Sequence, residues 1–245
     1  MAEPLSNSLP NSSPKTSVDA VQLSIVIPVL NDADHLDEVL ARLFSLRWIE
    51  DNCEVIICDG GSQDNSLEIA RRYSCRIEHS VASRAIQMNQ GAAVAQGRHL
   101  LFLHADSILP ANLDRLFPGD ARWGHFRLRL DNEAFVYRMI EFAINLRSRV
   151  TRVAGGDQGL YFARDFFQSL GAFPSIPLME DVAICKLARR EARPEIIESP
   201  MHSSSRRWQN NGVLKTILLM WSLRLAYFCG VDPSRLHRIY YPQRG

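Results

Sequence analysis

The chain has 245 residues, 46% of them hydrophobic and 22% charged, which is enough apolar material for a substantial buried core. Its 28 basic and 27 acidic residues nearly balance, so the net charge gives no electrostatic reason to expect nucleic-acid binding. No uninterrupted apolar run reaches about 18 residues, so a transmembrane span is not expected.

The cysteine content and the first segment indicate where the chain works. Its five cysteines are odd in number and lack C-x-x-C spacing, which favours small buried side chains in a reducing cytoplasm. Residues 1–20 are rich in Ser, Pro and Asn and lack the apolar core of a signal peptide. We expect these residues to form a disordered tail.

The first ordered elements alternate between strands and helices. The β-branched run at 23–28 (LSIVIP) predicts a strand that Pro28 ends, and apolar residues at helical spacing predict a helix through 36–44. A second strand is expected at 54–58, a helix after Asp64, and an Ala- and Gly-rich helix at 85–96. With a strand at 100–103, the order predicts a mostly parallel sheet with right-handed crossovers.

Three strand ends, at 29–32, 59–62 and 104–106, then lie along one edge of the sheet. Open α/β sheets bind ligands outside the carboxyl ends of their strands, so this edge predicts a nucleotide-type site. Asp106 follows the last of these strands, where a carboxylate can hold a divalent cation against phosphate groups. Taken alone, Asp106 fits better as a cap for a turn or for a short helix at 111–117.

The second half changes character. Alternating apolar residues at 126–130 predict a half-exposed strand, and a long helix is expected over about 133–152. A Gly-rich loop at 155–159, a strand at 160–163 and a short helix at 164–170 follow, and Glu180 and Asp181 open another helix.

The segment 213–231 is apolar on nearly every side but is broken by Lys215 and Arg224. It predicts a helix buried against the domain or against a second copy of the chain. The alternative is a helix lying in a membrane interface, with Lys215, Arg224 and Trp221 near the headgroups.

Several well-known motifs are missing from the sequence. No G-x-G-x-x-G follows the first strand, and there is no Walker loop, G-x-S-x-G elbow or His-rich zinc cluster. A nucleotidyltransferase would also need a Gly-rich loop after the first strand, which the chain does not have.

Six segments, in order, resemble the family 2 glycosyltransferases, which have the GT-A fold. Segments 24–32 (SIVIPVLND) and 55–64 (VIICDGGSQD) are similar to the first two strands and their nucleotide loops. The other similar segments are 84–97, 101–106 (LFLHAD), 159–173 with the acids at 180–181, and 206–208 (RRW). The variants LHAD, GGDQG and RRW together look most like a small bacterial subfamily associated with arsenosugar biosynthesis.

The resemblance implies an α/β GT-A-like fold, with a mostly parallel sheet flanked by helices and a C-terminal helical extension. It divides the chain into the tail at 1–20, a transferase domain at 21–210 and an apolar helix and tail at 211–245. Within the domain, 21–110 would bind the nucleotide and 111–210 the acceptor.

The resemblance also implies four kinds of site residue. Asp181 would be the general base that deprotonates the acceptor, supported by Glu180, and Asp157 and Gln158 would contact the acceptor. Asp106 would ligate Mg²⁺ or Mn²⁺, with His202 as a candidate second ligand. The nucleotide site would be formed by Pro28, Leu30, Asp32, Asp59, Gly61, Arg84, His104, Ala105, Arg207 and Trp208.

Each of these roles has a simpler alternative. The acids at 180–181 suit any helix N-terminus, and residues 157–158 suit a turn. The RRW segment is also consistent with a solvated basic face carrying one buried aromatic ring, and His202 with an exposed loop. His104 stands where the family has the first acid of D-x-D, which puts the metal requirement in question, and Gly60 replaces the second acid often found in the turn after the second strand.

We therefore expect an inverting, metal-assisted glycosyltransferase that uses a nucleotide sugar, with UDP as the expected nucleotide. The alternatives are a nucleotidyltransferase on a similar fold and a non-catalytic protein that binds a nucleotide sugar or a membrane surface. The expected location is the cytoplasm. Segment 213–231 would supply either a peripheral contact with the inner face of the membrane or a homodimer interface.

Overall fold

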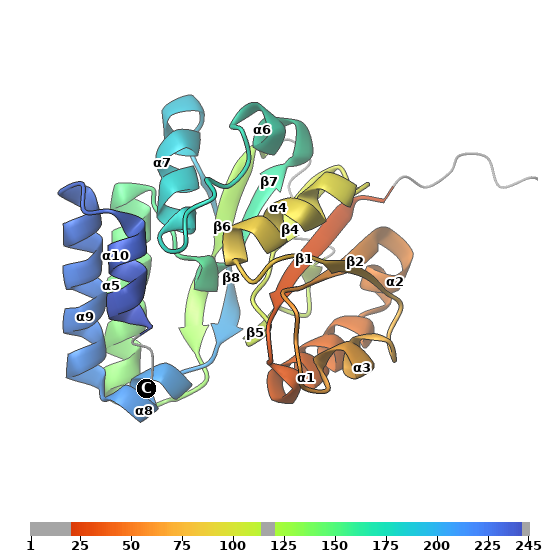
Figure 1. The fold of residues 1–245 in the computed structure, drawn as a ribbon, viewed down its shortest axis with the longest axis horizontal. Coiled ribbons are helices and arrows are strands. Elements are labelled where there is room, and N and C mark those ends of the chain that lie inside the picture. The colour runs from red at the N-terminus through yellow and green to blue at the C-terminus, as the bar shows by residue number, and fades with distance from the viewer. Residues whose placement is uncertain (1–20, 114–120, 242–245) are drawn as a thin grey trace, which may run out of the picture.

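The computed structural model describes residues 21–113 and 121–241 (Figure 1). Within these residues, one eight-stranded mixed sheet has the order β3-β2-β1-β4-β7-β6-β8-β5. The strands are β1 (Leu23–Val29), β2 (Cys53–Asp59), β3 (Cys75–His79), β4 (His99–Phe102), β5 (Ser107–Ile108), β6 (Trp123–Leu130), β7 (Leu160–Ala163) and β8 (Glu195–Ser203).

Helices cover both faces of the sheet (Figure 1). One apolar core lies between the sheet and α1, α2 and α3, and a second lies between the sheet and α4, α6 and α7. The helices are α1 (Ala33–Phe44), α2 (Arg47–Asn52), α3 (Ser66–Ala70), α4 (Arg84–Val94), α5 (Phe135–Thr151), α6 (Arg164–Ser169), α7 (Glu180–Glu191), α8 (Arg206–Asn211), α9 (Val213–Phe228) and α10 (Pro233–Tyr240).

The parallel part of the sheet confirms the predicted order, because β3, β2, β1 and β4 all run in the same direction. Pro28, however, does not end β1, which continues to Val29. The Val26 carbonyl accepts a hydrogen bond from the Leu103 N–H, and pairing with β4 stops at Val26. The N–H that Pro28 lacks would therefore point to a place where the ladder needs no bond.

The Ala- and Gly-rich helix α4 packs closely on the sheet, as its composition predicts. A methyl group at Gly91 would lie 2.7 Å from the Cys58 sulfur, closer than real side chains approach. Gly91 thus lets α4 lie directly over the ends of β1 and β2.

The second half extends the sheet with antiparallel strands, since β7 runs opposite to both β4 and β6. Strand β8 corrects a prediction, because it places His202 within a strand, opposite Ile108 of β5, and not in a loop. Its sequence, EIIESPMHS, interrupts the apolar alternation with Ser and Pro. The short helix considered at 111–117 falls largely outside the described residues.

The apolar C-terminal segment forms the predicted helix, α9, which is only partly buried against the rest of this chain. Only Thr216 and Leu223 are buried, while Leu219, Ala226 and Tyr227 pack partly against the core below α7. In the part of the chain that the structure describes, no helix combines the length and apolar character needed to cross a bilayer.

Candidate functional site

Asp59 organises the turn that follows β2. Its carboxylate is 1% exposed and accepts hydrogen bonds from the N–H groups of Gly61 and Ser62, each at 3.0 Å. Burial alone would raise the pKa of Asp59, but these bonds and the His79 ring outweigh burial and lower it. Gly61 has a φ of 95°, which favours glycine. Asp59 therefore holds the turn, and its predicted contact with a nucleobase stays a prediction.

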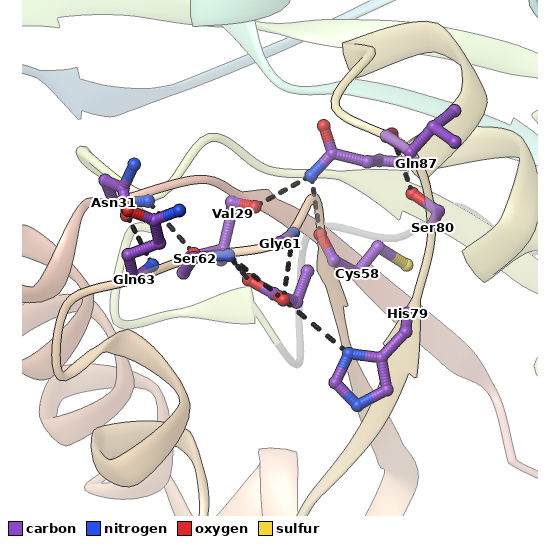
Figure 2. Close-up of polar contacts among 11 residues, drawn as sticks. Val29, Asn31, Cys58, Gly61, Ser62, Gln63, His79, Ser80 and Gln87 are labelled. Atoms are coloured by element: carbon purple, nitrogen blue, oxygen red, sulfur yellow. Dashed lines mark hydrogen bonds and ion pairs between the residues drawn. The ribbon is translucent and has the colours of Figure 1, made fainter.

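Asn31 joins the turn after β1 to the turn after β2 (Figure 2). Its side-chain oxygen accepts a hydrogen bond from the Gln63 N–H at 2.7 Å, and its own N–H donates to the Ser62 hydroxyl at 3.0 Å. Next to it, Asp32 contacts the His35 ring at 2.6 Å, while Leu30 is 45% exposed. The loop thus leaves Leu30 free to contact a ligand.

Gln87 is a site residue that the sequence reasoning missed. The side-chain amide of this α4 residue donates to the carbonyls of Val29, at 2.8 Å, and Cys58, at 2.7 Å (Figure 2). These carbonyls lie near the ends of β1 and β2, which stay paired as far as Val29 and Asp59, and Gln87 is only 4% exposed. The available signal was a polar amide on the buried side of α4, whose other buried residues are Ala85, Met88, Gly91 and Ala92.

A second group of side chains meets where β4 ends and α7 begins. Predicted residues from distant segments, His104, Glu180 and Asp181, come together around one small cavity. The cavity is lined by Met88, Phe102, His104, Gly156, Leu160, Phe173, Glu180 and Asp181.

His104 is uncharged at neutral pH. Burial, followed by the nearby charges of Arg84 and Arg207, lowers its pKa to about 3. The ring lies against the chain at Gly156, where a methyl group would come within 2.6 Å of Nε2. His104 therefore does not reproduce the negative charge of the acid that it replaces.

Glu180 and Arg84 form an ion pair with 3.8 Å between Nη1 and Oε1. Burial and the adjacent Asp181 raise the pKa of Glu180 to about 7, against the opposing effect of Arg84. Burial would lower the pKa of Arg84, but acidic neighbours, Glu180 above all, raise it. The pair brings α4 and α7 together at the cavity.

The Asp181 carboxylate is anchored at both oxygens. It accepts hydrogen bonds from the N–H of Gly156, at 2.9 Å, and from the N–H of Val182, at 2.7 Å. Met179, just before α7, has a φ of 72°, so the chain turns sharply into the helix. The acid is thereby held in one position at the cavity wall.

Asp157 and Gln158, the two residues predicted to contact the acceptor, lie in the 3₁₀ turn Gly156–Gln158 but have different surroundings. Burial raises the pKa of Asp157, while Arg147 and Arg224 oppose that shift. Gln158 is fully buried. Its side-chain oxygen accepts a hydrogen bond from the Gly155 N–H, and its side-chain nitrogen donates one to the Ser148 hydroxyl. Gln158 thus holds the turn, and an acceptor contact stays a prediction for both residues.

Arg147 and Arg224 were not predicted as site residues. Burial and the charge of Arg224 lower the pKa of Arg147 to about 10, and the Nε atoms of both side chains are buried without a hydrogen-bond partner among the described residues. Arg224 Nη2 lies 3.6 Å from where a methyl group on Gly155 would stand. Arg224 therefore points towards the cavity side, which corrects its expected place near lipid headgroups.

The remaining predicted residues are distributed more widely. The Arg207 guanidinium lies 4.4 Å above the Tyr240 ring, whereas Trp208 packs in an apolar cluster with Leu128 and Tyr137. Ala105 is buried, and Pro28 and Asp106 are half-buried. Of these, the charges of Arg207 and Asp106 act on the cavity residues.

The two predicted metal ligands do not form a protein-only metal site. His202 is exposed on β8 beside Arg129, whose charge acts with burial to lower its pKa. Across residues 21–113 and 121–241, no group of three or more His, Cys, Asp or Glu side chains could hold a metal ion. Metal ligation by Asp106 and by His202 stays a prediction.

Comparison with known proteins connects the first half of the chain to one family. Residues 24–117 match the model described as glycosyl transferase family 2. The glycosyltransferase YibD of Escherichia coli, whose name marks it as uncharacterised, is 34% identical over 91 residues, 35% of this chain and 26% of the relative. Glycosyltransferase AglE of Haloferax volcanii is 32% identical over 91 residues, 34% of this chain and 30% of the relative. The matches thus span less than a third of either relative.

Solved structures show the fold over more of the chain. Residues 1–349 of S. aureus TarS superpose with a TM-score of 0.61 at 16% identity, covering 75% of this chain and 60% of that one. The mannosyltransferase PcManGT of Pyrobaculum calidifontis, solved with GDP-Man and Mn²⁺, gives 0.59 at 19% identity over 84% and 61%. The chain therefore has the α/β fold of these GT-A transferase structures, and its residues 24–117 are similar to glycosyltransferase family 2.

Proposed function

We propose that the protein is a glycosyltransferase that moves a sugar from a nucleoside diphosphate to an acceptor nucleophile. One observation carries the proposal: His104, which lies within the segment similar to family 2, lines the same cavity as Glu180 and Asp181 of α7, and Glu180 forms an ion pair with Arg84 of α4. TarS has been solved with UDP-GlcNAc and PcManGT with GDP-Man, which supports a nucleotide-sugar donor.

The donor would lie along the ends of β1, β2 and β4. Pro28, Leu30 and Asp32 would border the nucleobase and ribose, with Asp59 and Gly61 shaping the turn beside them. Arg84 and Arg207 would face the diphosphate, where guanidinium groups suit phosphate oxygens. His104 and Ala105 would complete this wall, and UDP is the proposed nucleotide.

The side chains available as metal ligands suit a cation that is held mainly by phosphate oxygens. Mg²⁺ is commonly bound through one or two carboxylates together with substrate phosphates, so the single carboxylate of Asp106 is sufficient in chemical type. The neutral ring of His104 could ligate through nitrogen or donate to a phosphate. A bound Mg²⁺ or Mn²⁺ would stabilise the charge that develops on the leaving diphosphate.

The reaction would proceed with inversion, and Asp181 would act as its general base. Acceptor hydroxyls are poor nucleophiles, and a positioned carboxylate typically contributes about 10²–10⁴-fold. The bonds from Gly156 and Val182 fix this carboxylate at the cavity. Glu180 would support Asp181 and orient Arg84, and Asp157 would lie on the acceptor side. Membership of the arsenosugar-associated subfamily, and with it the acceptor, stays a prediction.

The test is consumption of nucleotide sugars by the purified full chain. UDP- and GDP-linked sugars are incubated with the protein and Mn²⁺, and release of the nucleoside diphosphate and the free or transferred sugar is followed. The proposal expects consumption of at least one donor and loss of that activity in Asp181→Asn. Release of pyrophosphate from a nucleoside triphosphate and sugar phosphate would instead identify a nucleotidyltransferase.

A further inference from the structure

Two helices outside the candidate site carry exposed stripes of large apolar side chains. On α9 the stripe residues are between 56% and 72% exposed, and on α5 between 47% and 79%. The α9 stripe consists of Leu214, Leu218, Trp221, Leu225 and Phe228, and the α5 stripe of Phe135, Met139, Phe142, Leu146 and Val150. Steps of three and four residues place each set along one side of its helix. We call these ten residues the α5–α9 apolar face.

The two stripes belong to neighbouring helices. Tyr137 and Ile140 of α5 share an apolar cluster with Leu128 of β6, and Ile144 of α5 and Ile217 of α9 pack against the same cluster. Figure 1 shows α5 and α9 together at one end of the sheet. Their inward sides are thus occupied, while no element within residues 21–113 and 121–241 covers the outward stripes. Monomeric soluble proteins rarely expose so many contiguous apolar side chains.

The exposed charges around this face are mostly basic. Residues 135–151 and 206–241 contain nine Lys or Arg and only two Asp or Glu, although Arg147 and Arg224 point inward and Arg149 is paired with Glu198 of β8. One of the two acids, Glu141, is 8% exposed and paired with Arg138, which leaves Asp232 as the exposed acid of these segments. Lys215, Arg235 and Arg238 are exposed.

This charge pattern distinguishes the possible occupants of the face. A second copy of the chain would bring basic borders against basic borders, without the opposite charges that usually flank paired helices. Anionic lipid headgroups would complement the borders, and the bilayer boundary would accept the apolar stripes. Exposed aromatic rings such as Trp221 and Phe142 are also typical of membrane interfaces.

We propose that the α5–α9 apolar face docks onto the surface of an anionic lipid bilayer, with α5 and α9 lying in the interface and not crossing it. The site is close to this surface, because α9 carries Arg224 on its inner side near Asp157. Docking would therefore bring the cavity next to the lipid surface. The proposal does not depend on catalysis.

The test is co-sedimentation of the full chain with vesicles of phosphatidylcholine alone and of phosphatidylcholine with phosphatidylglycerol. We expect binding to the anionic vesicles, a blue shift of Trp221 fluorescence that is lost in Trp221→Phe, and weaker binding at high salt. Leu218→Gln with Leu225→Gln should lower the partition coefficient at least about tenfold, because two buried leucines are lost. Each substitution Lys215→Gln, Arg235→Gln or Arg238→Gln should lower it up to about fivefold.

Val81→Gln is the matched control, because Val81 is 63% exposed but lies outside the face. It should leave vesicle binding unchanged, and circular dichroism should show native helix content in all variants. The proposal is overturned if the wild type ignores anionic vesicles, or if Leu218→Gln with Leu225→Gln binds them equally well. A stable dimer in solution that these substitutions dissociate, without vesicle binding, would assign the face to a second copy instead.

Discussion

The carboxylate of Asp181 accepts a hydrogen bond from the backbone N–H of Gly156 at 2.9 Å. This bond connects the first turn of α7 to the 3₁₀ turn that carries Asp157, and both border the cavity beside His104. The acid proposed as general base and the turn proposed to contact the acceptor thus form one structural unit.

Asp181→Asn should remove the proposed general base while leaving the fold and donor binding largely unchanged. The side-chain oxygen of Asn can still accept one of the two backbone bonds that hold Asp181, but the amide cannot take a proton, so turnover should fall about 10²–10⁴-fold. Donor affinity, measured by calorimetry with UDP, should stay within a few-fold of the wild type. Asp34→Asn, at a solvent-facing position of α1, is the control. Unchanged turnover in Asp181→Asn would show that Asp181 is not the base.

Glu180 predicts a dependence of stability on pH. Its pKa is about 7 in the folded protein and 4.5 in the absence of the fold, so the folded state retains its proton to higher pH. The stabilisation from protonation is complete below about pH 4.5 and is lost as the pH rises through 7.

Glu180→Gln removes the contribution of Glu180 protonation to the unfolding free energy. The decrease in unfolding free energy between pH 5 and pH 8 should therefore be smaller than in the wild type. Urea unfolding at the two pH values measures the difference. Glu68→Gln, at an exposed side chain of α3, should keep the wild-type decrease. Equal decreases in Glu180→Gln and wild type would refute the raised pKa.

Gln87→Leu should destabilise the turns that follow β1 and β2. The substitution removes two hydrogen bonds to the carbonyls of Val29 and Cys58, each worth about 0.5–1.5 kcal/mol, although the Val29 carbonyl keeps its bond from the Gly60 N–H. We expect a lower unfolding free energy together with weaker UDP binding. Gln168→Leu, at an exposed position of α6, serves as the control for both measurements. UDP affinity that is unaffected by Gln87→Leu would mean that the strand ends do not shape the nucleotide site.

Gly156→Ala should displace His104. The added methyl group would stand 2.6 Å from the ring nitrogen, and overpacking of this kind typically costs about 1–3 kcal/mol. The double variant with His104→Ala removes the obstacle, so the penalty of Gly156→Ala should be much smaller in that background. Thermal unfolding of the four proteins completes the cycle. Purely additive effects would show that the ring does not lie against residue 156.

Most of the parallel half could be predicted from sequence, because buried β-branched strands such as 23–29 and amphipathic helices such as α1 are local signals. Strand β8 could not, since Ser199, Pro200 and Ser203 obscure its alternation, and its pairing with β6 and β5 depends on distant segments. The exposed side of α9 could not be predicted either, because a helix that is apolar on all sides gives no indication of which side remains uncovered.

The site shows the same division between local and tertiary information. Motif position predicted that Asp106, Glu180 and Asp181 lie near one another, and their mutual effects on Arg84 agree with that. Gln87, Arg147 and Arg224 escaped prediction because their roles arise from tertiary placement and not from a motif. His202 shows the converse, since a residue type suited to metals lies on an exposed strand.

Thermal unfolding of the full chain with UDP, GDP and other nucleoside diphosphates, each with and without Mn²⁺, tests the proposed donor site most directly. A ligand at a hundredfold excess over its Kd stabilises the folded state by about 2.7 kcal/mol, so one nucleotide should raise Tm clearly. A further increase with Mn²⁺ is expected if Asp106 holds the cation against the diphosphate. No increase in Tm with any nucleoside diphosphate would contradict the account.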